Sequence, residues 1–324
     1  MCTALILLAA VALLAAAYPV GRWLEMRDAQ PEARGDYQQH YAYVPTIEVS
    51  GVTYRQRRNI TAILLMGVDQ DSDAVITGYR SGGQADFLQL VVIDDAQKKV
   101  VRLPIDRDTI TPITVLGVLG NKSGVRTSQI SLSHSFGDGG AQSCALTVEA
   151  ASNLLLGAPI NKYVAMNLDG ISVLNDAAGG VTVTLEDDFS ALDPAMTQGK
   201  TLTLEGVQAE YYVRSRMNVG VGTNEARMAR QREYISQLSR QLGDRIRADE
   251  AYIGELYDAL VPYLTTDMSR GLLTNLIWAA LDYEQVEMAL AGDHQIGTDG
   301  FMEFRVDEAA LQQTVLELFY QKVE

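Results

Sequence analysis

The sequence predicts an α/β protein: an α/β/α layered sandwich around a central mixed β-sheet, preceded by an N-terminal transmembrane helix. Three observations lead to this prediction. Apolar segments of strand length alternate with segments of helical periodicity along the chain. The chain has 324 residues, 47% of them hydrophobic, which is enough to build a large core. Residues 3–20 form an apolar run without a single charge.

The N-terminal run has about the minimum length that crosses a bilayer, roughly 20 residues, and it lacks the polar face of a soluble core helix. Residues 1–24 are therefore predicted to be a membrane anchor. A cleaved signal peptide is the alternative, because alanines occupy positions 15–17. In both cases we expect the rest of the chain outside the cytoplasm. Residues 25–56 are polar and are predicted to be an extracytoplasmic linker, followed by a globular domain at 57–324.

The first strands of the domain are apolar runs. Residues 62–68 (AILLMGV) form a continuous run, which is typical of a strand buried on both faces. Residues 87–93 and 99–105 predict two further strands joined as a hairpin. The later elements follow in order: helix 143–157, strand 162–168, helix 170–179, strand 180–185, strand or helix end at 209–216, helix 225–247, strand 301–307 and helix 308–321. The last 75 residues are expected to be mainly helical.

The charge balance limits the class of function. A net charge of −15 argues against nucleic-acid binding, which requires a basic surface, but it permits a local basic site for a small anion. The chain has three histidines and two cysteines without metal-ligand spacing, so a structural zinc site is not expected. A histidine-based triad is open only through His134 or His294, and a surface or buried structural histidine is the favoured alternative for both.

Two aspartates are predicted to lie at one edge of the sheet. Asp69 ends the first buried strand, and Asp86 immediately precedes the second. Sites in open α/β sheets form at such edges. Two carboxylates without histidines suit a hard divalent cation, Mg²⁺ or Mn²⁺. The alternative is that Asp69 caps a turn and Asp86 is solvated.

The third strand ends in the sequence PIDRDT, which places Arg107 and Asp108 at the same edge. A planar guanidinium group at this position is suited to gripping a phosphate. The alternative is a surface ion pair or an aspartate that caps a turn.

The most basic stretch of the chain begins at residue 214. If residues 209–216 end as a strand, Arg214 and Arg216 share one face of it. A glycine-bearing loop then leads into a helix on which Arg227, Arg230 and Gln231 share a face near the N-terminus. These side chains are predicted to converge on one anion. The alternative is a solvated basic helix that pairs with its own glutamates.

A set of motifs occurs in a fixed order: ILLMGVD, ADFLQLVVID, KVVRLPIDRDT, LDGISVLNDAAGGVTVTL, LEGVQAEYYVRSR and EARMARQREYI. From about residue 61 to residue 238, the chain thereby resembles the LytR-CpsA-Psr family of bacterial cell-envelope phosphotransferases. The resemblance implies a membrane-anchored catalytic domain that faces outward, with a deep apolar pocket for a polyprenyl tail. It also implies transfer of a glycopolymer, such as teichoic acid or capsular polysaccharide, from an undecaprenyl-pyrophosphate carrier to a muramic acid 6-hydroxyl of peptidoglycan.

The resemblance also implies roles for individual residues. Asp69 and Asp86 would bind Mg²⁺. The pyrophosphate would be held by Arg107, Arg214, Arg216, Arg227 and Gln231. Arg230 completes the RxxRQ motif, either as a further ligand of the pyrophosphate or as a support behind the direct ligands. The acceptor hydroxyl must lose a proton, for which Asp108 is the candidate base; the alternative is that Asp108 only orients its neighbour.

The sequence departs from the family pattern at two positions. Gln84 stands where family members commonly carry a basic residue, and Gln129 stands where a lysine is often found. Two further functions remain open beside glycopolymer transfer, and the two glutamines are the reason that the second of them stays open. One is hydrolysis of a polyprenyl pyrophosphate by water at the same site. The other is a non-catalytic envelope protein that binds or regulates through a polyprenyl ligand.

Overall fold

A computed structural model describes residues 46–70, 78–79, 82–215, 219, 224–249 and 251–323. The side chains of residues 224–229, 231, 232 and 235 also fall outside the description. The predicted anchor at 1–24, and the predicted linker as far as residue 45, lie outside the described residues. No helix within the described ranges is long and apolar enough to cross a membrane.

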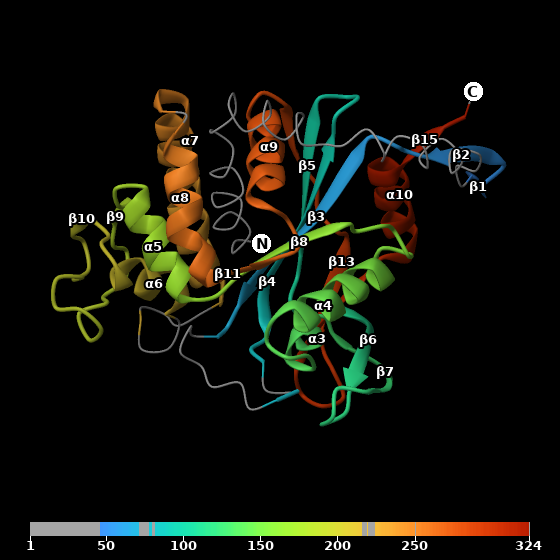
Figure 1. The fold of residues 1–324 in the computed structure, drawn as a ribbon. Helices are drawn as coiled ribbons and strands as arrows, with labels where there is room; N and C mark the ends of the chain where they lie inside the picture. Colours follow the sequence, from blue (N-terminus) through green and yellow to red (C-terminus); the bar gives the residue numbers. More distant parts are fainter. Residues whose placement is uncertain are drawn as a thin grey trace.

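A six-stranded mixed sheet forms the centre of the domain (Figure 1). Its strands are, in spatial order, β11 (Leu264–Thr266), β8 (Lys162–Met166), β3 (Ile60–Val68), β4 (Ala85–Asp94), β5 (Lys99–Ile105) and β12 (Glu284–Glu287). The β3–β4 and β4–β5 pairs are antiparallel, whereas β3–β8 and β12–β5 are parallel. The predicted hairpin of the second and third strands is thereby confirmed.

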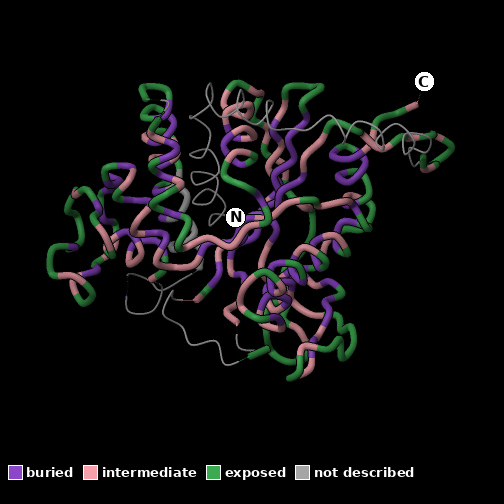
Figure 2. Tube along the Cα trace, viewed as in Figure 1, coloured by how far each residue is buried: buried purple, intermediate pink, exposed green. Residues whose placement is uncertain are grey.

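The sheet separates two hydrophobic cores. Alternate side chains of β3 point to opposite faces, so that Ile63 and Leu65 enter one core while Leu64 and Met66 enter the other. Helices contribute apolar side chains to both cores, and Figure 2 shows the buried trace running through the middle of the molecule. The predicted mixed α/β fold with a central mixed sheet is confirmed.

Each face of the sheet is covered by its own helices (Figure 1). The first face packs against α5 (Asp169–Ala177), α6 (Val207–Arg214), α7 (Asn224–Ala248), α8 (Tyr252–Leu260) and α9 (Arg270–Leu281). The second face packs against α3 (Leu132–Ser135), α4 (Ala141–Leu154) and α10 (Glu308–Phe319). A 3₁₀ turn, η2 (Val261–Tyr263), joins α8 to β11.

Four small sheets lie outside the central sheet in the described residues. They are the pairs β6–β7 (Ile110–Leu116, Lys122–Gln129), β9–β10 (Thr182–Thr184, Thr201–Thr203) and β13–β14 (Gly292–Ile296, Met302–Val306), and the triplet β1–β2–β15 (Thr46–Val49, Val52–Gln56, Tyr320–Lys322). The end of the predicted linker, residues 46–56, therefore forms a hairpin whose second strand, β2, pairs with the last strand of the chain. The prediction of a mainly helical C-terminal region is wrong in part, because β11 to β15 alternate there with α8, α9 and α10.

Candidate functional site

Strand directions bring the predicted site residues to one edge of the central sheet. The C-terminal ends of β3 and β5 lie there, together with the start of the antiparallel strand β4. The register pairs Val68 with Ala85 and Leu88 with Ile105. Asp69 follows β3, and its backbone N–H donates to the Gln84 carbonyl at 2.9 Å. The prediction that Asp69 and Asp86 approach one edge is consistent with this register.

Asp86 lies inside β4 rather than immediately before it, and it lies in a β-bulge. Gly67 pairs with Phe87 and Val68 pairs with Ala85, so that Asp86 is the extra residue between two matched pairs. Without the bulge, alternation would point Ala85 to the same face as Phe87; instead the two lie in opposite cores. A bulge re-aims one side chain at a sheet edge, and here that side chain is a carboxylate.

Arg107 links the end of β5 to the start of β4. Its Nη1 lies 2.6 Å from Asp86 Oδ1, its Nη2 donates to Gln84 Oε1 at 2.7 Å, and its Nε lies 3.6 Å from Asp108 Oδ1. The guanidinium group remains about one-third exposed. Gln84 therefore accepts a hydrogen bond from the arginine at a position where a basic residue would repel it.

Arg214 reaches the same edge from the helical layer. Its Nη2 lies 2.9 Å from Asp69 Oδ1, and its Nη1 lies 2.5 Å from Glu210 Oε1. Arg214 is the last residue of α6, so the strand interpretation of this residue is wrong. Helix formation buries Tyr212 and Val213 and places Glu210 one turn before the arginine. Arg216 lies outside the described residues.

Arg230 is almost fully buried, and protein groups occupy its guanidinium. Nη1 pairs with Asp187 at 2.5 Å, Nε donates to the Tyr212 carbonyl at 3.3 Å, and Nη2 donates to the Ser215 carbonyl. The group also lies 5.2 Å from the centroid of the Phe189 ring. These contacts oppose the prediction that Arg230 binds pyrophosphate directly, because its donors are engaged with the protein. The side chains of Arg227 and Gln231 lie outside the described residues.

Asp108 is the centre of a polar network beside Arg107. Gln129 Nε2 donates to Asp108 Oδ1 at 3.1 Å and to the Met302 carbonyl at 2.7 Å, which ties the carboxylate to the β13–β14 hairpin. Burial raises the pKa of Asp108; Arg107 opposes this shift, Asp106 adds to it, His294 opposes it and Asp86 adds to it. A carboxylate with a raised pKa is a better proton acceptor.

His294 joins the same region and was not predicted as a site residue. Its Nε2–H donates to Asp106 Oδ2 at 3.0 Å, and its ring lies 4.9 Å from that of Phe304. No sequence pattern indicates this contact, because the β13–β14 hairpin brings together two residues that are 188 positions apart.

His134 has a structural position behind the site. Its Nδ1–H donates to the Gly83 carbonyl at 2.9 Å, and its Nε2 lies 4.0 Å from Cys144 Sγ. Burial lowers the pKa of His134 and raises that of Cys144 to about 12, so the pair is neutral and holds no thiolate nucleophile. Gly83 packs so closely that an added Cβ would lie 2.3 Å from the Asp69 carbonyl oxygen. The alternative of a buried structural histidine fits His134.

The two aspartates fit a water-rich magnesium site. The side chains of Asp69 and Asp86 are 50% and 38% exposed, and both offer only oxygen ligands. Mg²⁺ keeps several waters and is often held by one or two carboxylates. Within the described ranges, no group of three or more histidine, cysteine or acidic side chains could hold a metal ion.

The chain is similar to known proteins in sequence and in fold. Residues 28–319 match the LytR_cpsA_psr family. A protein of Halalkalibacterium halodurans, named polyisoprenyl-teichoic acid–peptidoglycan teichoic acid transferase TagU, is 28% identical over 71% of this chain and 70% of its own length. The protein of the same name from Enterococcus faecalis is 29% identical over 79% of this chain and 78% of its own length. Among solved structures, protein gbs0355 of Streptococcus agalactiae has a TM-score of 0.61 at 21% identity, covering 80% of this chain and 87% of that chain.

Proposed function

The chain belongs to the LytR-CpsA-Psr family, and from this premise we propose that it is a phosphotransferase. It moves a glycopolymer from a polyprenyl-pyrophosphate carrier, undecaprenyl pyrophosphate, to peptidoglycan and makes a phosphodiester. The names of the two relatives support transfer of teichoic acid to peptidoglycan as the reaction class. The observation that carries the proposal is the pairing of two arginines with two carboxylates at one sheet edge, Arg214 with Asp69 and Arg107 with Asp86.

The reaction requires stabilisation of a leaving phosphate. The acceptor oxygen attacks the phosphorus that carries the glycopolymer, and the bond from this phosphorus to the bridging oxygen breaks. Polyprenyl phosphate then leaves with the bonding electrons and additional negative charge. Arg107 and Arg214 present guanidinium groups to this charge, and fixed donors at such a position lower the barrier. Arg216, Arg227 and Gln231 are proposed to complete the phosphate site.

Asp108 is proposed to take the proton from the acceptor hydroxyl. Its partial burial favours the protonated form, which is the product of that step. Gln129 holds one carboxylate oxygen at 3.1 Å, and this contact fixes the orientation of the base. The neutral amide leaves the pKa of Asp108 raised, whereas a lysine at the same position would lower it.

Asp69 and Asp86 are proposed to hold Mg²⁺, which when bound supplies positive charge against the pyrophosphate oxygens. Before ligands bind, the carboxylates orient the two arginines by the ion pairs of 2.9 and 2.6 Å. Arg230 is proposed to act indirectly, through the backbone. It anchors the Ser215 carbonyl, and thereby the backbone that leads to Arg216.

The experiment is a transfer assay with the full chain, a radiolabelled polyprenyl-pyrophosphate-linked glycopolymer and peptidoglycan. Label should become insoluble with the wall, and Arg107→Ala with Arg214→Ala should abolish this transfer. Arg240→Ala is a matched control, since Arg240 is exposed and contacts only Ser236 among the described residues. Release of soluble polymer phosphate without attachment to peptidoglycan would show that the protein is a hydrolase and not a transferase. Retention of lipid without any turnover would favour a binding protein.

The domain is further proposed to be membrane-attached and extracytoplasmic, because its substrate is a membrane lipid and its acceptor is the wall. A reporter that is active only after export, fused after Glu324, should be active in cells. A silent reporter on a membrane-associated fusion protein would contradict this topology.

A further inference from the structure

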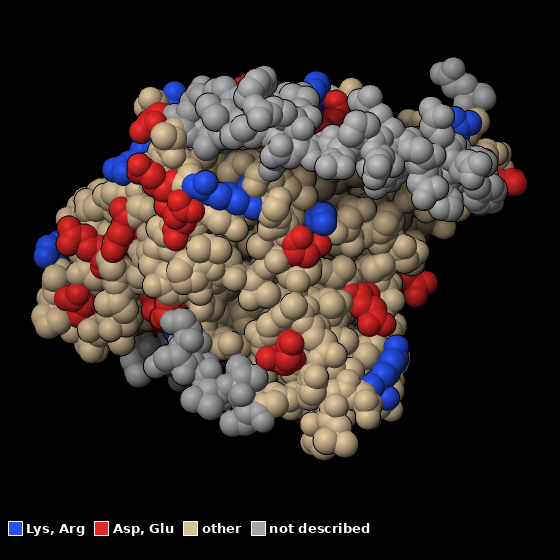
Figure 3. Space-filling model, viewed as in Figure 1, with Lys and Arg blue, Asp and Glu red and all other residues tan. Residues whose placement is uncertain are grey.

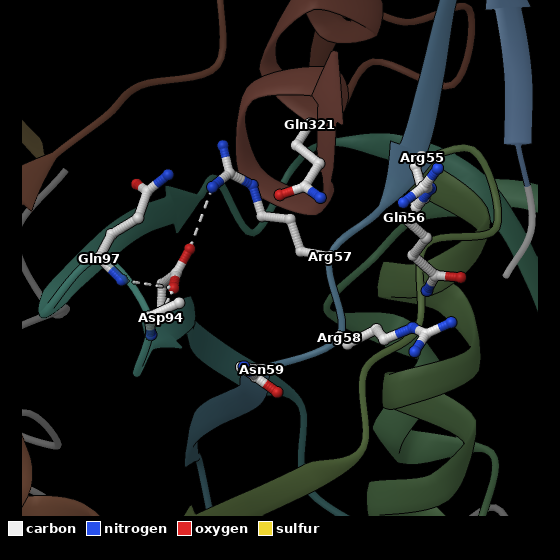
Figure 4. A pocket seen from close by; sticks show the side chains of 9 residues that line it. Arg55, Gln56, Arg57, Arg58, Asn59, Asp94, Gln97 and Gln321 are labelled. Atoms are coloured by element: carbon white, nitrogen blue, oxygen red, sulfur yellow. Dashed lines mark hydrogen bonds and ion pairs between the residues drawn. The ribbon is translucent and has the colours of Figure 1, made fainter. Parts of the chain in front are cut away.

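A polar cavity lies at the opposite end of the sheet from the candidate site. Its volume is about 320 Å³, and it is formed where β2, the start of β3, the end of β4 and the last strand meet (Figure 4). Strand β4 spans the distance: Ala85 is at the candidate site and Asp94 lines the cavity. Along this strand of ten residues, which rises by about 3.3 Å per residue, Ala85 and Asp94 are about 30 Å apart. We name this cavity the distal pocket.

One wall of the distal pocket is held by an ion pair and several hydrogen bonds. Arg57 Nη1 lies 3.1 Å from Asp94 Oδ2, while its other nitrogens donate to the Tyr320 carbonyl at 2.9 Å and the Glu317 carbonyl at 3.4 Å. Asp94 Oδ1 accepts from two backbone N–H groups of the following turn. Figure 4 shows Arg57 reaching Asp94 between two glutamines. These contacts satisfy Asp94 fully, so its charge is already compensated.

The remaining lining is rich in donors. Arg55 and Arg58 are exposed residues at the rim, and Figure 4 shows the Arg58 side chain directed away from Arg57 and Asp94. The β2–β15 register pairs Arg55 with Gln321, so that the two side chains lie on one face of this small sheet. Across the described residues, the side chains of Arg55, Asn59, Gln97 and Gln321 make no hydrogen bond or ion pair with the protein. Three arginines and one compensated aspartate thus line the same pocket, in a chain whose net charge is −15.

This lining selects the chemistry of a ligand. Guanidinium groups bind phosphate through parallel hydrogen bonds, and amide groups both donate to and accept from hydroxyls. The lining contains no aromatic ring on which a base would stack and no histidine or cysteine for a transition metal. We propose that the distal pocket binds a phosphate-bearing polyol or sugar unit. This inference rests on the proposed function only for the origin of the unit. That origin would be a phosphate-containing repeat of the glycopolymer, distant from the bond that reacts.

The test uses the full chain in detergent and glycerol 3-phosphate as the probe, with uncharged glycerol as the comparison. Hydrogen exchange of the Ala96 and Gln97 amides, which donate to Asp94, reports on the pocket. Glycerol 3-phosphate should slow this exchange in a saturable manner, whereas glycerol should not. Arg55→Gln with Arg58→Gln should weaken the effect by about tenfold or more, the result of losing charge-assisted hydrogen bonds.

Three further variants complete the test. Arg55→Gln alone alters a single exposed side chain, and should still weaken binding if the double variant misfolds. Arg107→Gln with Arg214→Gln disables the candidate site and should leave the protection at Ala96 and Gln97 in place. Arg240→Gln is the matched surface control. Absent protection in the wild type, or equal protection in the Arg55 variants, would overturn the inference. The readout needs no turnover, so it remains valid if the transferase activity is not found.

Discussion

Arg230 lies in the protein interior, and this position leads to a prediction that distinguishes a structural role of the side chain from direct binding of pyrophosphate. In Arg230→Gln, the ion pair with Asp187 is lost, together with most of the donation to the carbonyls of Tyr212 and Ser215. The arginine side chain is 5% exposed and its partner 17% exposed, so water does not take over these contacts. The variant would leave Asp187 as a nearly buried, uncompensated carboxylate.

The magnitude follows from this burial. Removing one partner of a buried ion pair costs about 3–5 kcal/mol, because the other charge stays in place unpaired. Domains are stable by only about 5–15 kcal/mol in total. We therefore expect Arg230→Gln to lower the free energy of unfolding by about 3–5 kcal/mol. Arg230→Gln in an Asp187→Asn background should cost much less, because the stranded charge is gone.

The assay is urea unfolding followed by circular dichroism for the wild type, both single variants and the double variant. Arg240→Gln, on the exposed face of the same helix, is the control and should change the free energy by less than about 0.5 kcal/mol. A loss below about 1 kcal/mol for Arg230→Gln, the size of an exposed pair, would refute the reasoning. So would strict additivity of the two substitutions, since the pair would then carry no coupling.

Further predictions concern the sheet edge. Calorimetric binding of Mg²⁺ or Mn²⁺ should be lost in Asp86→Asn, and equal binding would remove this residue from the metal site. Arg107→Gln with Arg214→Gln should tighten Mg²⁺ binding several-fold in anion-free buffer, because the competing cations are removed; weaker binding would contradict the competition. Transfer activity should fall at low pH with a midpoint above the ordinary aspartate pKa of about 3.9, since burial raises the pKa of Asp108 and the base must be deprotonated. Gln129→Lys should move that midpoint to lower pH. The folded-state pKa of Asp108 is raised, so its contribution to stability is fully present at low pH and is lost as the pH rises through that pKa. Asp108→Asn removes the titrating group, and its stability relative to the wild type should therefore increase as the pH rises through the same range.

The central sheet was predictable because burial leaves a strong trace in the sequence. Residues 62–68 read as a doubly buried strand, and the structure buries Ala62 to Met66 completely. The bulge at Asp86 left no such trace: it depends on how β3 and β4 match along their length, which no local pattern encodes. The carboxylate was therefore identified by its place in a motif, but its orientation was not.

Arg214 shows a different limit. The sequence YYVRSR contains β-branched and aromatic residues and is compatible with a strand or a helix. Packing decides the outcome, since α6 buries Tyr212 and Val213 against the core and ends at the arginine. The contact from His294 to Asp106 and that from Gln129 to Met302 were equally inaccessible, because both require the β13–β14 hairpin to fold back on the sheet edge.

Acidic and basic side chains are scattered over the face of the molecule seen in Figure 3. At the sheet edge, pairing with carboxylates accounts for the presence of Arg107 and Arg214 in an acidic chain. Acting alone, a pyrophosphate must take Arg107 and Arg214 from Asp86 and Asp69, and a divalent cation must take the carboxylates from the arginines. With both proposed ligands bound, every charge would exchange one opposite partner for another, and no charge would be left unpaired. The two binding events then strengthen each other by the same factor in either order. If the proposed function holds, these charge pairs would favour joint binding of a metal ion and a pyrophosphate.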